Sequence, residues 1–300
     1  MKHFAALAVI LLVAGGAIYF AQRRPRQDAV SAGAILNAAA DWQRDVTRAP
    51  MHLTRISDRE ESRIGDQIAA HYLSGDEEKS PETKAAQAYV SQVGERVAAH
   101  ARRKLDFRFH LVADRNLINA FALPGGHVFI GQGLIDQMSS EDELAFVLGH
   151  EIEHIDHYHS AERIQIEAQL RKLDLDDLAG LAGIPMSLWQ AGYSKDEEAE
   201  ADREGLRLAV AAGYSAQGAL DLLERWTKLH REYVIHAEDP TDELGQLAIE
   251  GLNGYFRSHP LPSERLAQAR EVIAHDNLVK QAMDRPLTPL RIERAAGEAK

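Results

Sequence analysis

The chain has 300 residues, of which 45% are hydrophobic, and a formal net charge of -12. After about the first 25 residues, this length suits one catalytic domain or one domain with helical additions. The acidic balance argues against a nucleic-acid partner, because phosphate binding needs a basic stripe. The run Arg102-Arg103-Lys104 is better interpreted as the solvated end of a helix. The absence of cysteine excludes disulfides and thiolate metal sites.

The amino-terminal segment, residues 1–25, contains a charge-free stretch from Phe4 to Phe20 that is followed by Arg23 and Arg24. Such a stretch is short for a membrane span and also fits the core of a secretory signal. We expect an uncleaved membrane anchor, with a cleaved signal as the alternative. By the positive-inside rule, the basic cluster after it would favour a cytoplasmic catalytic domain.

The chain then continues with helical patterns and a polar turn. Residues 26–56 are interpreted as a helical linker, with a loosely specified helix over 31–48 that ends at Pro50. Two amphipathic helices are expected at residues 57–72 and 83–103.

A small antiparallel sheet is expected next. Residues 107–112 alternate at period two, as a half-buried strand does. Residues 118–123 and 127–130 are two further extended runs, and Pro124-Gly125-Gly126 between them predicts a hairpin turn.

The following helix is expected to run from a cap at Ser140 to about residue 172, and it contains His150-Glu151-Ile152-Glu153-His154. Residues four apart on a helix project from one face, so His150 and His154 can bind the same ion, one Zn2+ per chain. Glu151 lies about 100° round the axis, where it could act as general base toward a water that attacks a peptide carbonyl. The alternative is a chance occurrence on a surface helix, but the apolar residues of this helix carry the motif inward.

Two histidines leave a catalytic zinc site one protein ligand short. The metzincin pattern is excluded, because His157 and Ser160 stand where it has Gly and His. On a continuous helix His157 would lie about 10 Å along the axis from His150, so we expect a solvated or supporting residue there.

An acidic run after Ser194 offers the third ligand. Ser194 and Glu197 form a capping box, which assigns Glu197 to the helix end and leaves Glu198 facing inward. Asp202 lies on the same face and can accept a hydrogen bond from a zinc-bound histidine. The small residue Gly205 allows close approach to the zinc helix. A merely solvated acidic face is the alternative.

The remaining pattern completes an α+β fold, with helices before and after a small sheet. Residues 173–190 are apolar but interrupted by Gly and Pro, which predicts short helical turns that could form a lid. Further helices are expected at residues 197–211, 215–231, part of 242–252, and 263–274.

Four separated motifs resemble, in order, those of the M48 zinc metallopeptidases, over about residues 57–274. They are the run 119–126, the zinc helix with the later His159, the run 194–202, and Ser258-His259-Pro260 with Arg265. The resemblance implies a mostly helical zincin-type (gluzincin) peptidase domain over residues 57–300, with Glu198 as a metal ligand. The chain departs from the family pattern at Glu153, usually Gly or Ala, and at Lys195, usually Arg.

The resemblance also implies roles for the late motif and for the strand. His259 and Arg265 would face the metal and stabilise the oxyanion, although His259 could instead fill the open coordination position and hold the resting enzyme inactive. The strand that includes Asn119, Ala120 and Phe121 would pair with an extended substrate, because main-chain pairing is largely blind to sequence.

The sequence therefore predicts a membrane-anchored zinc endopeptidase. The resemblance implies unfolded or misassembled proteins as substrates, protein quality control in the cell envelope, and a periplasmic catalytic domain. One alternative is a zinc-bound chaperone or assembly factor with weak or gated proteolysis. Another is a prenyl-protein protease, which the single candidate span disfavours.

Overall fold

The computed structural model of the chain describes residues 56–73, 80–171, 177, 180–181, 183, 192–235 and 259–292. The chain divides into two compact units, Met1–Ala49 and Pro50–Lys300, and every described residue belongs to the second. The expected anchor, the helix over 31–48, the segment 242–252 and most of 173–190 lie outside the described residues. Within the described part, no helix combines the length and the apolar character needed to cross a membrane.

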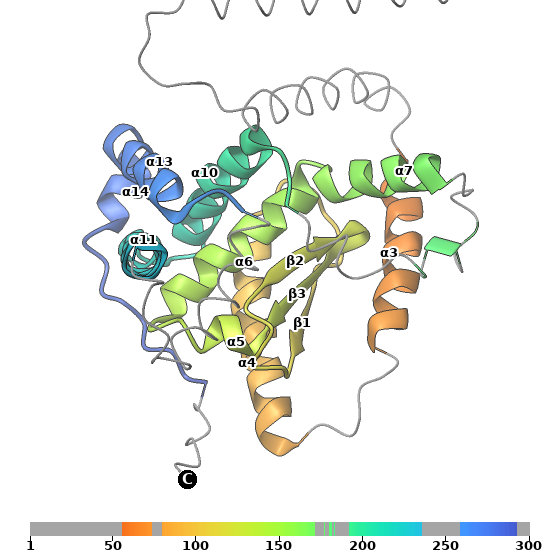
Figure 1. Ribbon diagram of the computed structural model, residues 1–300, viewed down its shortest axis with the longest axis horizontal. Coiled ribbons are helices and arrows are strands. Elements are labelled where there is room, and N and C mark those ends of the chain that lie inside the picture. The colour runs from red at the N-terminus through yellow and green to blue at the C-terminus, as the bar shows by residue number, and fades with distance from the viewer. Residues whose placement is uncertain are drawn as a thin grey trace, which may run out of the picture. The chain divides into compact units, whose positions relative to one another are not determined.

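The described elements are mostly helices around a three-stranded sheet (Figure 1). In chain order they are α3 (Asp58–Leu73), α4 (Pro81–Ala98), β1 (Arg108–Val112), β2 (Ala120–Leu123), η2 (Pro124–Gly126), β3 (His127–Gly131), α5 (Gln132–Ile135), α6 (Glu141–Asp156), α7 (His159–Arg171), α10 (Lys195–Ala211), α11 (Gln217–Ile235), α13 (Pro262–His275) and α14 (Asn277–Ala282). The expected helices correspond to α3, α4, α6 with α7, α10, α11 and α13, whereas the short helices α5 and α14 were not anticipated.

The sheet is mixed, so the antiparallel sheet expected from the sequence is wrong. Its strand order is β1-β3-β2, with β2 antiparallel and β1 parallel to β3. The hairpin between β2 and β3 is confirmed, and Gly125 and Gly126 in its turn have φ values of 78° and 104°, which glycine adopts without strain. The wrong part of the prediction was the partner of β1. The connection over residues 113–119 does not place β2 beside β1, and β3 pairs with β1 instead.

Both faces of the sheet are covered, and alternate residues of each strand point to opposite layers. On one face, Val128 and Ile130 of β3 belong to a hydrophobic cluster that includes α4 and α6. On the other face, Phe129 and Phe121 join a second cluster with residues of α3 and α7. The sheet therefore holds the zinc-motif helix on one side and α3 with α7 on the other.

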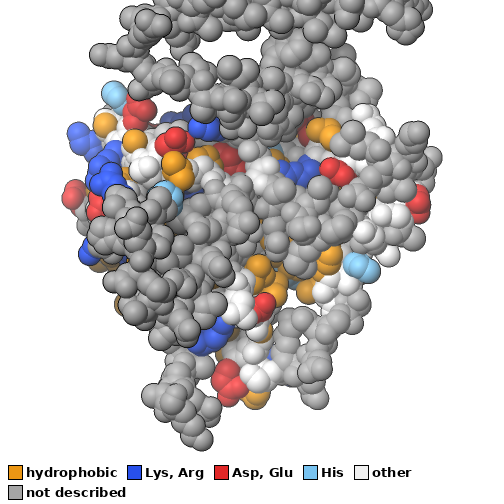
Figure 2. All heavy atoms as spheres, viewed as in Figure 1, with side chains coloured by type: hydrophobic (Ala, Val, Ile, Leu, Met, Phe, Trp, Pro, Cys, Tyr) orange, Lys and Arg blue, Asp and Glu red, His pale blue; other side chains and the backbone are white. Residues whose placement is uncertain are grey.

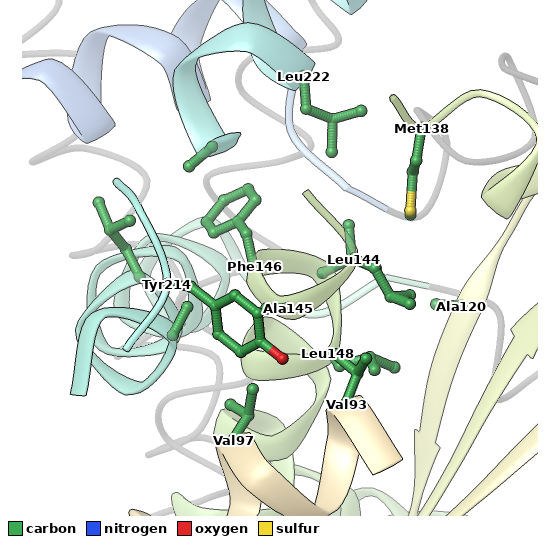
Figure 3. Packing of buried hydrophobic residues seen from close by; sticks show 14 of the residues in the cluster. Val93, Val97, Ala120, Met138, Leu144, Ala145, Phe146, Leu148, Tyr214 and Leu222 are labelled. Atoms are coloured by element: carbon green, nitrogen blue, oxygen red, sulfur yellow. The ribbon is translucent and has the colours of Figure 1, made fainter. Parts of the chain in front are cut away.

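Helix α6, which contains the His-Glu-x-x-His motif, is buried at every residue. Figure 3 shows part of its cluster, where Leu144 and Leu148 of α6 join Val93 and Val97 of α4. Each fully buried leucine contributes roughly 1.5–3 kcal/mol relative to an exposed one. Hydrophobic burial therefore fixes the position of the motif.

The amino-terminal end of α6 is tied to segments far along the chain. The Asp142 carboxylate accepts hydrogen bonds from the backbone N–H groups of Ser215 and Thr288, both at 2.6 Å. Glu141 accepts from the Tyr214 hydroxyl at 2.7 Å. These acidic residues also lie where the helix dipole favours negative charge.

The carboxyl-terminal end of α6 differs from the expected continuous helix to residue 172. Helix α6 ends at Asp156, and α7 begins at His159 after Tyr158, whose φ of 65° does not continue a right-handed helix. The Asp156 carboxylate accepts hydrogen bonds from the backbone N–H groups of Arg102 (2.8 Å) and Arg103 (2.6 Å). These long-range bonds stop α6 where local periodicity alone would have extended it.

The same contacts correct the expected end of the helix over 83–103. Helix α4 ends at Ala98, and the residues after it turn to present their N–H groups to Asp156. Arg103 is 8% exposed, pairs with Glu61 and donates to the Ile155 carbonyl at 2.6 Å. It is a buried connection between α3 and α6, and not the solvated helix end that the sequence suggested.

The outer surface over α13 and α14 carries basic and acidic side chains close together (Figure 2). Arg207 pairs with Asp276 at 2.8 Å, and Arg270 pairs with Glu224 at 2.7 Å. Exposed pairs of this kind contribute about 0–1 kcal/mol each. The packing of α13 therefore depends on its buried face and on Arg265, described below.

Candidate active site

Two glycines set the distance between α6 and α10, which run side by side (Figure 1). A Cβ added to Gly205 would lie 2.6 Å from the backbone N of His150, and one added to Gly149 would lie 2.6 Å from the Gly205 carbonyl oxygen. Any side chain there would force the helices apart. The expectation that Gly205 permits a close approach is borne out by this geometry.

Helix α10 begins with the expected capping box. The Ser194 side chain accepts from the Glu197 N–H, and the Glu197 carboxylate accepts from the Ser194 N–H at 2.8 Å. With Glu197 engaged at the helix end, Glu198 points toward α6, where it is 1% exposed.

His150, His154 and Glu198 converge in the interior. The two histidine Nε2 atoms are 3.1 Å apart, Glu198 Oε2 lies 3.4 Å from His150 Nε2, and Glu198 Oε1 lies 3.7 Å from His154 Nε2. Tetrahedral zinc, with bonds of about 2.0–2.2 Å to N and O, places its ligand atoms about 3.4 Å apart. The three residues therefore fit a zinc ion in donor type and in spacing.

Glu151 is the unsatisfied group of the site. It is 1% exposed, and its Oε1 is buried and makes no hydrogen bond within the described part of the chain. Glu151, His150 and His259 bring one polar atom each within 4.8 Å of one another. Burial raises the pKa of Glu151. A buried carboxylate oxygen without a partner, beside a metal-type cluster, is suited to a water or substrate hydrogen bond.

His259 reaches the cluster from the segment before α13. Its Nδ1 lies 2.7 Å from Glu198 Oε2, and its ring centroid lies 5.0 Å from that of His150. The late His-Pro motif is therefore brought to the zinc-motif helix across more than 100 residues of sequence.

Asp202 and Arg265 lie behind His150. Asp202 Oδ1 is 2.9 Å from His150 Nδ1, on the side of the ring opposite to Glu198. Arg265 is 1% exposed and donates to both Asp202 oxygens, from Nε at 2.9 Å and from Nη2 at 2.6 Å. These contacts orient Asp202, so they support a positioning role for Arg265, and its expected role at the oxyanion stays a prediction.

The charges of the site favour a cation. Burial alone would raise the pKa of Asp202, but Arg265 and His150 outweigh it and hold that pKa at about 2. His259 and His150 likewise hold the pKa of Glu198 well below its usual value, against the effect of burial. Burial alone would lower the pKa of His150, but hydrogen bonds to Asp202 and Glu198 raise it to about 9.

The comparison with known proteins assigns this arrangement to a family. The sequence profile of peptidase family M48 matches residues 84–273, a span that includes every residue of the cluster and covers more than half of the chain. The chain belongs to peptidase family M48. Members of this family are metallopeptidases, so the cluster of two histidines and a glutamate lies in a protein of the corresponding class.

Relatives of this M48 chain carry protease names. It is 31% identical over 201 residues to a Vibrio cholerae protein named as a beta-barrel assembly-enhancing protease, and 28% identical over 200 residues to the beta-barrel assembly-enhancing protease of Escherichia coli. It is 27% identical over 180 residues to the mitochondrial metalloendopeptidase OMA1 of Arabidopsis thaliana. The alignments cover 61%, 61% and 58% of this chain, but 38%, 38% and 32% of the relatives. The chain thus spans well under half of their length.

Tyr193 is a neighbour of the M48 site that sequence reasoning missed. Its ring stacks on His154, with centroids 3.9 Å apart and planes 19° apart, and its backbone N–H donates to Glu198 Oε1 at 3.1 Å. The Arg163 guanidinium carbon also lies over the Tyr193 ring, 3.8 Å from its centroid. The only signal was its position directly before the Ser194 cap, which no rule connects to a metal ligand.

The expected substrate strand lies against α6 as β2, an edge strand of the described sheet. Ala120 and Phe121 are each 2% exposed, and the Phe121 ring stacks on Phe129, away from α6. The Asn119 carbonyl accepts from the Gly131 N–H at 2.9 Å. The side chain of Phe121 thus belongs to the core, and only the strand backbone is suited to contact a substrate.

Proposed function

We propose that this M48 chain is a zinc-dependent endopeptidase in which Glu151 is the general base. The observation that carries the proposal is a buried Glu151 oxygen that forms no hydrogen bond to any described residue and lies beside the cluster of His150, His154 and Glu198. A zinc ion bound by these three residues would polarise the scissile carbonyl and acidify a water molecule.

The residues around the cluster would perform the proton and positioning steps. Glu151 would accept the proton of the attacking water and pass it to the leaving amine, and its raised pKa makes it a stronger base than an exposed glutamate. Asp202 would hold the proton on His150 Nδ1, which leaves Nε2 as the metal-binding nitrogen. Arg265 would keep Asp202 in place.

The hydrogen bond between His259 Nδ1 and Glu198 would fix the orientation of the His259 ring. If its Nδ1 donates to Glu198 and the ring is doubly protonated, Nε2–H can donate to the developing oxyanion. If the ring is neutral, the Nε2 lone pair can instead occupy the open metal position. We favour the oxyanion role and test it below.

The substrate would be a protein chain in extended form. The edge of β2 would supply main-chain hydrogen bonds, and since Ala120 and Phe121 are buried, this edge must open before a substrate can pair with it. We further propose a role in protein quality control of the cell envelope, in line with the names of the bacterial beta-barrel assembly-enhancing proteases. A membrane anchor at the charge-free stretch Phe4 to Phe20 is proposed from the sequence alone.

The test uses the full chain, loaded with zinc, and casein as substrate. Glu151→Gln should retain zinc and lose about 10²–10⁴-fold in turnover, because an amide cannot accept the proton. Glu204→Gln, which changes an α10 carboxylate that pairs with Arg203 and Arg207, is the matched control. Near-normal cleavage by Glu151→Gln would overturn the general-base assignment. If the wild-type chain suppresses aggregation of a client protein without cleaving it, the chaperone alternative is correct.

A further inference from the structure

We propose that His157, His159 and Glu200 form a second site for a divalent transition-metal ion, on the side of His154 that faces away from Glu198. The site goes beyond the proposed peptidase function and would take Zn2+ or a similar first-row ion, because two imidazoles and one carboxylate suit such ions. None of its three residues contributes to the first cluster.

The ligand atoms have the spacing of a metal site. Glu200 Oε2 lies 3.1 Å from His157 Nδ1 and 3.8 Å from His159 Nε2, and the two histidine ring centroids are 5.7 Å apart. The corresponding histidine-to-glutamate separations in the first cluster are 3.4 and 3.7 Å. Both sets lie close to the value of about 3.4 Å expected around a tetrahedral zinc ion.

The break between α6 and α7 builds this site. Tyr158, with its φ of 65°, separates the two helices, and the residues on either side of it present their imidazoles to Glu200 of α10. A continuous helix would place neighbours two apart on different faces. The Glu200 side chain is 36% exposed, which gives an ion a route from solvent, whereas the side chains of His157 and His159 are 14% and 7% exposed.

A buried carboxylate supports one of the proposed ligands. Glu153 is 3% exposed, and its Oε2 lies 3.0 Å from His157 Nε2. Both atoms are buried, and neither forms a hydrogen bond of good geometry with any described residue. The Glu153 carboxylate lies within ion-pair distance of His157 Nε2, so it would favour a proton on that nitrogen and leave Nδ1 as the metal-binding nitrogen. This pair is an observation independent of the spacing.

The two metal sites share one contact, which couples them. His154 Nδ1 lies 3.0 Å from His159 Nδ1. When His154 Nε2 binds zinc, its proton is on Nδ1 and is donated to His159 Nδ1. If His159 Nε2 also binds a metal, its own proton moves to Nδ1, and two N–H groups then face each other. An ion in the second site therefore weakens the support of His154, and by linkage each ion lowers the affinity for the other.

The first test counts ions and does not depend on peptidase activity. The full chain, stripped with a chelator and titrated with Zn2+ alone, should bind two ions per chain, and His157→Ala and Glu200→Gln should each bind one. Glu198→Gln, which disables the first cluster, should retain the second ion, and Glu204→Gln should behave as the wild type. Circular dichroism checks that each variant is folded. A wild-type chain that saturates with one ion, or an unchanged count in Glu200→Gln, would overturn the proposal.

The second test measures the coupling, and it rests on the proposed function. Excess Zn2+ should inhibit casein cleavage by the wild type by about 10-fold or more, the scale expected when a ligand histidine loses its supporting contact. The Glu200→Gln variant should resist this inhibition. Equal inhibition of both proteins would overturn the coupling. A chain that cleaves nothing yet binds two ions would refute the peptidase proposal and leave the second site standing.

Discussion

The spacing of α6 and α10 offers a sharp test of how the zinc site is built, through Gly205→Ala. The added Cβ would lie 2.8 Å from the Gly149 carbonyl carbon and from the His150 Cα. Carbon atoms pack at about 3.5 Å or more, so the helices must separate locally by roughly 0.7 Å. Metal–ligand distances tolerate only about 0.2 Å, and Glu198 is the ligand that α10 supplies.

The expected loss of folding stability in Gly205→Ala is small, whereas the expected loss of zinc affinity is large. Overpacking costs about 1–3 kcal/mol, while alanine returns about 1 kcal/mol through its higher helix propensity. We therefore expect a folded protein, destabilised by no more than about 2 kcal/mol, whose zinc affinity falls at least about 10-fold, as it does when the support of a ligand is lost.

Chelator competition measures the zinc affinity, and thermal unfolding of the metal-free chain measures the stability. Glu204→Ala changes the preceding residue, which faces Arg203 and Arg207, and should leave the zinc affinity unchanged. Wild-type zinc affinity in Gly205→Ala would refute the reasoning, because it would mean that α10 can move without displacing Glu198.

Three further substitutions separate the roles of the site residues. Glu198→Ala should release zinc, whereas Glu197→Ala should keep it and lose about 0.5–2 kcal/mol of stability with the helix cap; metal analysis with the opposite outcome would place the ligand at Glu197. Asp202→Ala should lower zinc affinity about 10–100-fold, measured by chelator competition, and an unchanged affinity would show that His150 needs no support. His259→Ala should lower turnover about 10²-fold at unchanged zinc content, whereas a rise in basal proteolysis would assign His259 to the open metal position.

The orientation of His150, His154 and Glu198 could be predicted because the rules that determine it are local. The four-residue spacing of His150 and His154 fixes their common face, and the capping box of Ser194 and Glu197 fixes the phase of α10 and so the direction of Glu198. Each of these rules operates within one or two helical turns. The face of α10 that carries Glu198 was therefore predicted from local rules, whereas its role as a metal ligand stays a prediction.

The parts that could not be predicted depend on distant segments. The parallel pairing of β1 with β3 depends on which of the later strands lies beside β1. The alternation of residues within a strand does not identify its neighbour. The end of α6 depends on Asp156 receiving N–H groups from residues more than 50 positions earlier. Arg103 looked like a surface residue until Glu61 of α3 supplied its buried partner.

The hydrogen bonds at the amino-terminal end of α6 have a consequence for the order in which this helix gains its partners during synthesis. Asp142 bonds to Ser215, 73 residues later, and to Thr288, 146 residues later. Local contacts cannot replace these partners, and a growing chain emerges from the ribosome amino terminus first. The amino-terminal end of the helix with His150 and His154 therefore gains these two partners only after residues 215 and 288 have been synthesised.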